Sequence, residues 1–183
     1  MKPRICVFCG SRYGREQRYR EVAKAFGEAL AENGFELIYG GGDVGLMGTL
    51  ADGALSRSGT VTGFIPERLL AREVGHRGLT RLDITEDMFE RKRKMIVGAD
   101  AFVALPGGLG TVDEILDAVT LRQLGYHDRP IYLLDLDGFW QPFVALVEAI
   151  VDAEFAGKTA RALFQLKSDI DDIVNQLKGD FAS

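Results

Sequence analysis

Short apolar runs alternate with longer amphipathic segments along the whole chain. The runs are rich in Val, Ile, Leu and Phe, which is typical of buried strands. The longer segments repeat apolar residues three and four positions apart, which is typical of helices that cover a sheet. Strands are predicted at Arg4–Cys9, Glu36–Tyr39, Thr60–Ile65, Arg81–Ile84, Ala101–Leu105, Pro130–Asp135 and Leu163–Leu166. Helices are predicted at Arg18–Asn33, Leu46–Ser58, Thr85–Val97, Thr111–Leu124 and Gln141–Ala153, and after Ser168, with Thr85 and Ser168 as caps.

Regular alternation of strands and helices predicts the fold class. Such a pattern forms a parallel sheet with helices on both faces. No internal repeat, low-complexity tract or linker divides the sequence, and 183 residues are enough for one well-buried core. We therefore expect a single α/β domain over residues 1–183, with a Rossmann-like doubly wound parallel sheet.

The charge balance limits the partners of the protein. The chain has 27 Asp and Glu against 22 Lys and Arg, a net charge of −5. This balance argues against a broad surface for nucleic acid or anionic membrane. The first residues lack the apolar run of a signal peptide, and no stretch has the length of a membrane span, so we expect a cytoplasmic protein.

Cys6 and Cys9 form a Cys-x-x-Cys pair within the first predicted strand. Strand residues three apart point to opposite faces of the sheet, so the two thiols should diverge. No second cysteine pair exists, and His76 and His127 are isolated in the sequence. We expect packing thiols in a reducing compartment and no metal site.

Three glycine-rich turns follow predicted strands: CGSRYG, GGGDVGLMG and PGGLGTVDE. Ligands of doubly wound sheets bind beyond the carboxyl ends of the strands, where such turns lie. The turn at 40–45 matches Gly-x-Gly-x-x-Gly, and Glu67 follows at about the distance of a ribose-binding acid. A dinucleotide-dependent oxidoreductase is therefore an alternative. Two features argue against this alternative: Pro66 precedes Glu67, and the motif follows the second predicted strand rather than the first. For the turn itself, a role in packing and in shaping a substrate loop is favoured over contact with a mononucleotide.

The turn at 106–111 is suited to phosphate. Its glycines let backbone N–H groups converge at a helix N-terminus, where the helix dipole favours an anion. Thr111 can cap this helix or bind a phosphate oxygen, and no P-loop lysine is present. Thr111 and Glu114 have capping-box spacing. The spacing leaves capping and catalysis by Glu114 equally open.

A carboxylate beside a bound phosphate requires a cation nearby. Residues 91–94 are four cations in a row, and because they fan around a helix at about 100° per residue, at most two can face one pocket. Arg91 and Lys92 lie nearer the loop edge of the sheet, whereas Arg93 and Lys94 are expected on a solvated face. An oxocarbenium-like ribose carbon is the other candidate cation, and a carboxylate would stabilise it.

GGGDVGLMG, DMFERK and PGGLGTVDE, in this order and spacing, resemble the Lonely Guy (LOG) family of cytokinin-activating phosphoribohydrolases. CGSRYG and LRQLGYHDRPIYLLD extend the likeness over nearly the whole chain. The resemblance implies hydrolysis of the N-glycosidic bond of a cytokinin riboside 5′-monophosphate or AMP, without metal or other cofactor. The products would be a free base and ribose 5-phosphate. Members were long labelled lysine decarboxylases, but no pyridoxal-binding lysine motif is recognisable here.

The resemblance also implies site residues. Arg91 and Glu114 match the residues that carry catalysis in the family. Substrate contacts would be made by Met88, Lys92, Gly107, Gly108, Gly110 and Thr111, and by Glu73 and Thr120. Family members form homodimers or larger assemblies, so a homodimer is expected.

Two features depart from the family pattern. Phe89 stands where His is common, and Arg12 with Tyr13 stands where small residues are frequent. These departures concern substrate preference more than the type of reaction. A nucleotide-sensing module without useful hydrolysis is a further alternative, and release of free base from AMP distinguishes the two.

Overall fold

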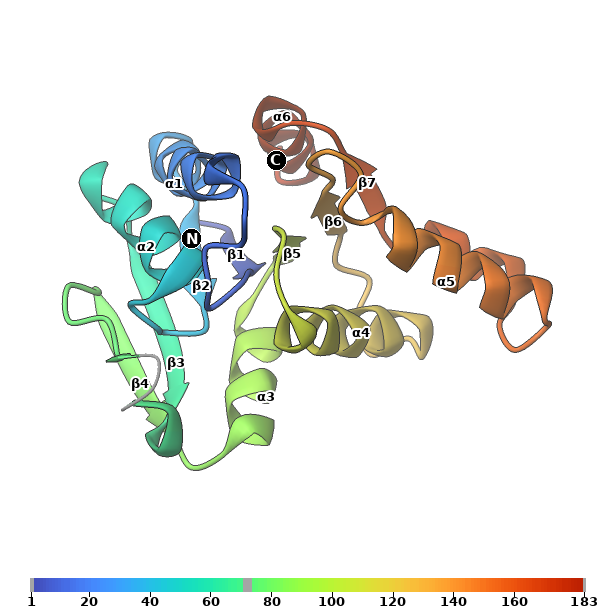
Figure 1. The fold of residues 1–183 in the computed structure, drawn as a ribbon, viewed down its shortest axis with the longest axis horizontal. Coiled ribbons are helices and arrows are strands. Elements are labelled where there is room, and N and C mark those ends of the chain that lie inside the picture. Colours follow the sequence, from blue (N-terminus) through green and yellow to red (C-terminus); the bar gives the residue numbers. More distant parts are fainter. Residues whose placement is uncertain (1, 71–73, 183) are drawn as a thin grey trace.

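The computed structural model describes residues 2–70 and 74–182, and it contains a seven-stranded sheet in which neighbouring strands run parallel (Figure 1). The strand order is β4-β3-β2-β1-β5-β6-β7. The strands are β1 (Arg4–Phe8), β2 (Glu36–Tyr39), β3 (Val61–Pro66), β4 (Arg81–Thr85), β5 (Ala101–Ala104), β6 (Ile131–Leu134) and β7 (Gln165–Lys167). The predicted doubly wound parallel sheet is confirmed.

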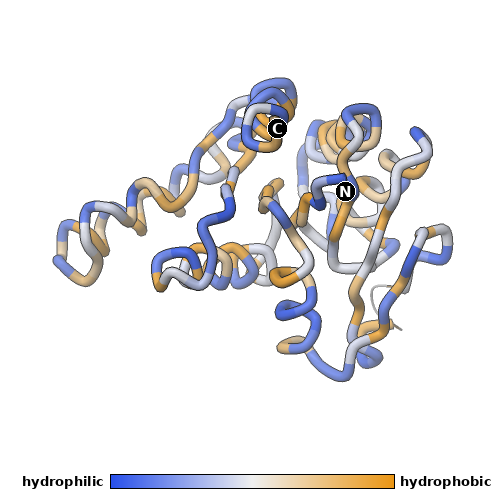
Figure 2. Tube along the Cα trace, turned by 180° about the vertical axis from the view of Figure 1, so that it is seen from behind, coloured by the Kyte–Doolittle hydropathy of each residue, from blue (hydrophilic) through white to orange (hydrophobic). Residues whose placement is uncertain are grey.

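Helices cover both faces of this sheet and bury two separate apolar clusters. The helices are α1 (Gln17–Glu32), α2 (Gly45–Ser56), α3 (Met88–Gly98), α4 (Leu109–Gln123), α5 (Gln141–Asp152) and α6 (Ile170–Asp180). One cluster packs α1, α2 and α6 on the sheet, and the other packs α3, α4 and α5. The far end of α5 projects from the body (Figure 1), and hydrophobic and hydrophilic positions alternate along it (Figure 2).

Strand β1 divides the sheet into two halves. The chain builds β1, β2, β3 and β4 outward in one direction and then returns, so that β5 pairs with the other side of β1. Loops that leave the carboxyl ends of β1 and β5 run apart at this switch of direction, and a crevice opens between them. The Gly10 N–H donates to the Pro106 carbonyl across this crevice over 3.2 Å.

Cys6 and Cys9 lie on opposite sides of the sheet, as predicted. Cys6 belongs to the cluster under α3 and α4, and Cys9 to the cluster under α1 and α2. Both thiols are buried, and no disulfide joins them. Alternation along β1 therefore explains the Cys-x-x-Cys spacing.

Two predicted helix caps were wrong by one or two positions. The cap of α3 is Asp87, whose Oδ1 accepts the Glu90 N–H over 2.8 Å, and the Thr85 hydroxyl donates to the Asp87 carbonyl instead. The cap of α6 is Asp169 rather than Ser168. At both sites a carboxylate reaches the free N–H groups and also complements the helix dipole, so it replaces the neighbouring hydroxyl.

Among the residues that the structure describes, no helix is long and apolar enough to cross a membrane.

Candidate active site

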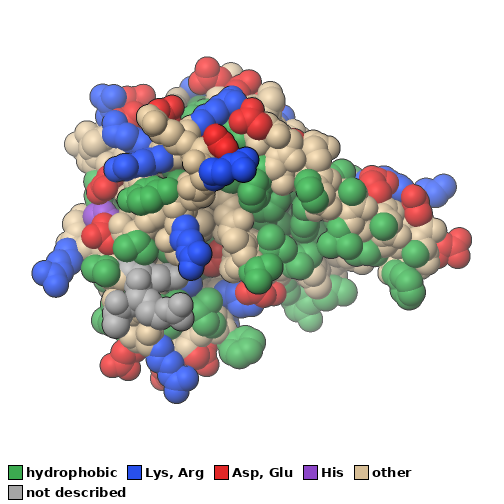
Figure 3. All heavy atoms as spheres, in the orientation of Figure 1, with side chains coloured by type: hydrophobic (Ala, Val, Ile, Leu, Met, Phe, Trp, Pro, Cys, Tyr) green, Lys and Arg blue, Asp and Glu red, His purple; other side chains and the backbone are tan. Residues whose placement is uncertain are grey.

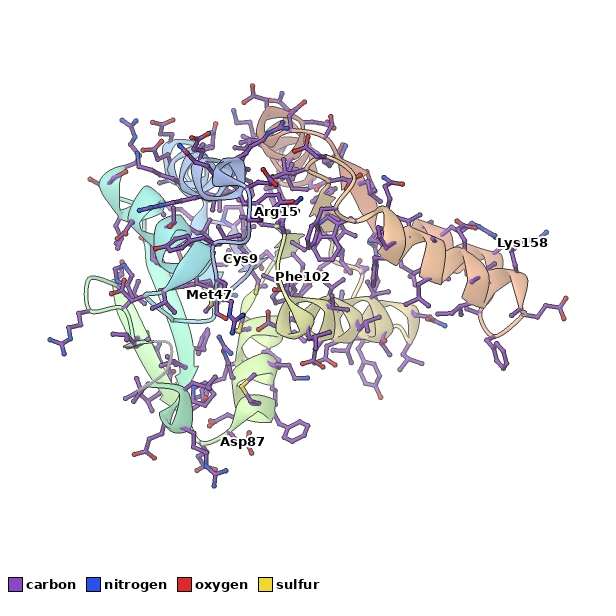
Figure 4. All side chains as sticks on the ribbon, in the orientation of Figure 1. Cys9, Arg15, Met47, Asp87, Phe102 and Lys158 are labelled. Atoms are coloured by element: carbon purple, nitrogen blue, oxygen red, sulfur yellow. The ribbon has the colours of Figure 1, made fainter. Side chains whose placement is uncertain are left out.

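A pocket of about 550 Å³ lies at the crevice between the loops after β1 and β5. Cys9 and Met47 mark its position at the carboxyl edge of the sheet (Figure 4). Its walls are formed by Cys9, Gly10, Ser11, Arg12, Tyr13, Gly14, Tyr19, Leu46, Met47, Arg91, Pro106, Gly107, Gly108, Leu109, Gly110, Thr111, Glu114 and Phe139. All three glycine-rich turns or the helices they open therefore contribute to one pocket.

The start of α2 is closed to an anion. The N–H groups of Leu46 and Met47 both donate to the Gly10 carbonyl, over 3.0 and 3.3 Å. These are the groups that would hold a phosphate at a Gly-x-Gly-x-x-Gly turn. Glu67, the expected ribose-binding acid, is exposed in the short helix Glu67–Leu69 and does not line the pocket. The dinucleotide alternative has no support in this geometry, and the turn at 40–45 shapes the pocket wall.

The start of α4 is open. Its N-cap is Gly108, which has no side chain to satisfy the first N–H groups of the helix. Cβ atoms added at Gly108 and Gly110 would meet nothing within 4 Å, so packing within the protein does not require glycine there. Glycine at these two positions leaves room for a ligand to approach the backbone.

Thr111 and Gly107 form the floor of this open helix start. Thr111 is buried, and its Oγ1 folds back over Gly107, where any Cβ would collide with it. Glycine at 107 is therefore required by the hydroxyl that it accommodates. The hydroxyl and the N–H groups of α4 face the same pocket and together can bind a phosphate.

Glu114 does not cap α4. Because the N-cap is Gly108, Glu114 lies in the second turn, too far along the helix to reach the N-cap N–H. The capping-box hypothesis is therefore wrong. Glu114 is only 8% exposed and lines the pocket on the same helix face as Thr111, three residues earlier. A buried carboxylate in a phosphate-binding pocket is suited to stabilising a developing positive charge.

Arg91 brings a positive charge beneath the pocket. Arg91 is 4% exposed, and its guanidinium donates from Nη2 to the Gly40 carbonyl over 2.7 Å and from Nε to the Phe64 carbonyl over 3.0 Å. A Cβ at position 40 would collide with Nη2, so glycine there gives the guanidinium its space. The turn after β2 and the end of β3 thus fix Arg91 before any ligand binds.

Arg91 and Glu114 act on the same neighbouring side chain. Burial raises the pKa of the Cys6 thiol, the Glu114 carboxylate raises it further, and the Arg91 guanidinium lowers it. Both charged groups therefore lie within electrostatic range of one residue of β1. The structure brings together two side chains that are far apart in the sequence, as the predicted site requires.

Comparisons with known proteins identify relatives of this chain. A family model described as a possible lysine decarboxylase matches residues 47–177. The chain is 42% identical over 160 residues to the cytokinin riboside 5′-monophosphate phosphoribohydrolase LOG of Oryza sativa subsp. japonica, covering 87% of this chain and 66% of the rice protein. The enzyme of the same name from Rhodococcoides fascians is 39% identical, with 95% and 88% of the two chains covered. The chain belongs to the LOG family.

The fold of this LOG-family chain is shared more widely. A molybdenum cofactor carrier protein from Chlamydomonas reinhardtii matches with a TM-score of 0.76 at 20% identity, covering 100% of both chains. This likeness shows the fold alone. The curated names of the more similar relatives are those of nucleotide N-glycosyl hydrolases, which confirms the enzyme class predicted from the motifs.

Lys92 of this LOG-family chain does not line the pocket. Its Nζ pairs with Asp113 over 2.9 Å and Asp117 over 2.8 Å on α4. Burial lowers the pKa of Lys92, but hydrogen bonds with both carboxylates outweigh burial and raise it overall. Lys92 therefore ties α3, which carries Arg91, to α4, which carries Glu114.

The other two cations of the run also face away from the pocket. Arg93 is exposed, as expected. Lys94 is half-buried between Asp83 and Glu90, at 3.1 and 3.0 Å, so the expectation of a simple solvated face is wrong for it. Acidic neighbours from β4 and from the preceding helical turn account for this difference.

Two of the remaining predicted contacts, Met88 and Thr120, do not line the pocket. Met88 contacts Arg91 through its sulfur, 3.7 Å from Nη1, but does not line the pocket. Thr120 is exposed in a groove between α3 and α4. Glu73 lies outside the described residues.

One wall of the pocket is aromatic, and it was not predicted from the sequence. Tyr19 of α1 and Phe139 before α5 pack edge to face, with ring centroids 6.1 Å apart. Their separation by more than a hundred residues gave no sequence signal that they meet.

Proposed function

We propose that the pocket hydrolyses the N-glycosidic bond of a nucleoside 5′-monophosphate, either a cytokinin riboside 5′-monophosphate or AMP. The products are a free base and ribose 5-phosphate. The proposal rests on one observation: the open N-terminus of α4 and the buried Glu114 carboxylate share one face of one helix. Thr111 and Glu114 are separated by about 4.5 Å along the axis. One ribose 5-phosphate can therefore place its phosphate at the first residue and its anomeric carbon beside the second.

The reaction uses this spacing. The α4 amides and the Thr111 hydroxyl hold the 5′-phosphate. As the bond from the anomeric carbon to the base nitrogen breaks, its electron pair leaves with the base, and Glu114 stabilises the cationic sugar. A water oxygen then bonds to the anomeric carbon, and Glu114 accepts one of its protons and releases it to solvent. The departing base takes up a proton from solvent, which completes the free base. A guanidinium keeps its protons in proteins, so Arg91 orients the substrate and balances charge and does not act as an acid.

Incubation of the protein with AMP and with isopentenyladenosine monophosphate tests this function directly. We expect free adenine or isopentenyladenine together with ribose 5-phosphate, detected by liquid chromatography. Adenosine, which lacks the phosphate that α4 binds, is expected to be cleaved poorly and serves as the control. Tight nucleotide binding without release of base would contradict the proposal and favour the sensing module.

A homodimer also belongs to this proposal, with the groove between α3 and α4 as its contact surface. The groove is lined by Phe89, Lys92, Arg93, Ile96, Val97, Leu116, Asp117, Thr120 and Leu121. Three of its apolar side chains are strongly exposed: Phe89 at 79%, Val97 at 66% and Leu116 at 41%. Hydrophobic side chains also gather next to it, over α4 and α5 (Figure 3). A continuous apolar surface of this kind is typical of an interface between subunits.

Substitution Phe89→Asp tests the interface. A charge in the groove is expected to shift the protein from dimer to monomer in analytical ultracentrifugation, because the loss of the apolar ring and the cost of desolvating a carboxylate both oppose association. Phe155→Asp is the matched control, since Phe155 is 86% exposed beyond α5 and outside the groove. A monomeric wild-type protein, or a dimer that dissociates only in the control variant, would contradict the proposal that the groove is the dimer interface.

A further inference from the structure

Arg12 lies at the edge of the pocket, in the loop after β1, and its backbone is held against both glycine-rich helix starts. Two residues earlier, the Gly10 N–H donates to Pro106 and the Gly10 carbonyl accepts from Leu46 and Met47. A Cβ at Gly10 would lie 3.4 Å from the Cα of Gly107. The loop that carries Arg12 is thus fixed beside the open start of α4.

The charge of Arg12 is available to a ligand. Of the described residues that line the pocket, Arg12 and Arg91 are the cations, and Arg91 is buried and hydrogen-bonded to backbone carbonyls. Arg12 is exposed, and its side chain makes no hydrogen bond or ion pair with another described residue. The other arginines of segment 12–20 each have a partner: Arg15 pairs with Glu16, Arg18 with Asp137, and Arg20 stacks on Tyr13.

We propose that Arg12 is a specificity-determining residue that binds the substrate's 5′-phosphate together with the amides at the start of α4. This inference rests on the proposed function and deepens it. A phosphate monoester carries a charge of about −1.5 to −2, more than one helix N-terminus of about half a charge can balance. Glu114 adds a negative charge to the same pocket. A guanidinium is suited to this task because its planar fork matches two phosphate oxygens.

The role of Arg12 is selection of nucleotides over nucleosides. Its contact is with the phosphate, which is not changed during the reaction, so the binding energy is the same in the ground state and in the transition state. Loss of such a contact raises KM and leaves kcat largely unchanged. Loss of Glu114 would lower kcat and leave KM largely unchanged. Kinetic measurements therefore distinguish the roles of the two residues.

Substitution Arg12→Ser in the 183-residue chain tests this role. We expect KM for AMP to rise by about tenfold or more, because a charge-assisted hydrogen bond is lost. The rate with adenosine should stay the same, and the increase of KM with salt should become weaker than in the wild type. Arg12→Lys, which keeps the charge but not the fork, is expected to restore part of the affinity. Arg15→Ser is the matched control, because Arg15 is on the same loop (Figure 4) but does not line the pocket.

Calorimetry with ribose 5-phosphate separates this inference from the proposed function. The dissociation constant should rise in Arg12→Ser and not in Arg15→Ser, whether or not the protein cleaves AMP. If wild-type protein releases no base but the variant still loses affinity, the proposed function is wrong and the phosphate contact stands. Unchanged KM for AMP and unchanged affinity for ribose 5-phosphate in Arg12→Ser would overturn the inference.

Discussion

Substitution Glu114→Gln is expected to lower kcat for AMP hydrolysis by about a thousandfold, the range typical of a lost general base or charge stabiliser. The amide has nearly the same shape, so α4 should keep its start and its phosphate contacts. KM and the thermal unfolding midpoint should therefore change little. Steady-state kinetics and a melting curve of the same preparation measure both.

Asp113→Asn is the matched control for Glu114→Gln. Asp113 is the neighbouring residue on α4, exposed and outside the pocket, and it is one of two carboxylates that pair with Lys92. The second pairing, with Asp117, remains, so activity should stay near that of the wild type. Near-normal turnover of Glu114→Gln would show that the carboxylate has no part in the chemistry.

Substitution Arg91→Ala is expected to reduce both activity and stability. Loss of the buried guanidinium leaves the Gly40 and Phe64 carbonyls without their donor, at a cost of about 1–3 kcal/mol for each buried group. Removal of the charge beside the sugar is expected to lower kcat/KM by about 100-fold or more. Urea unfolding measures the first effect and base release measures the second.

Two further variants separate these effects of Arg91. Arg91→Lys keeps a cation but cannot donate to both carbonyls in the geometry of the guanidinium, so activity should stay low while part of the stability returns. Arg93→Ala, an exposed position on the same helix that does not line the pocket, should leave the rate of base release near that of the wild type. Wild-type kinetics in Arg91→Ala would exclude Arg91 from the site.

The fold was predictable because its signals are local. The strands at the centre of the sheet are short, mostly apolar runs, and each of the glycine-rich turns follows such a run. The sheet and the edge that carries the pocket therefore follow from the sequence. The residue that caps the start of a helix is less well determined by the sequence. At Thr85 to Asp87 and at Ser168 to Asp169 several residues can cap, and the choice depends on which side chain reaches the free N–H groups.

Helix periodicity did not predict which way the side chains of Arg91 and Lys92 point. Spacing along α3 separates Arg91 from Lys92 by about 100°. It contains no information on which neighbour each one meets. Lys92 turns toward α4 because Asp113 and Asp117 lie there, and Arg91 turns toward the pocket because Gly40 leaves space. Such pairings arise from the packing of distant segments.

The Gly10 carbonyl accepts the hydrogen bonds that a bound phosphate would otherwise accept at the start of α2. In a dinucleotide-binding Rossmann protein, the amides at the first glycine-rich helix receive an oxygen of the pyrophosphate. Here the corresponding amides of α2 receive an oxygen of the chain's own peptide bond. Evolution of dinucleotide binding on this scaffold would first require the loop after β1 to be rebuilt, because no point substitution of a side chain removes a main-chain carbonyl.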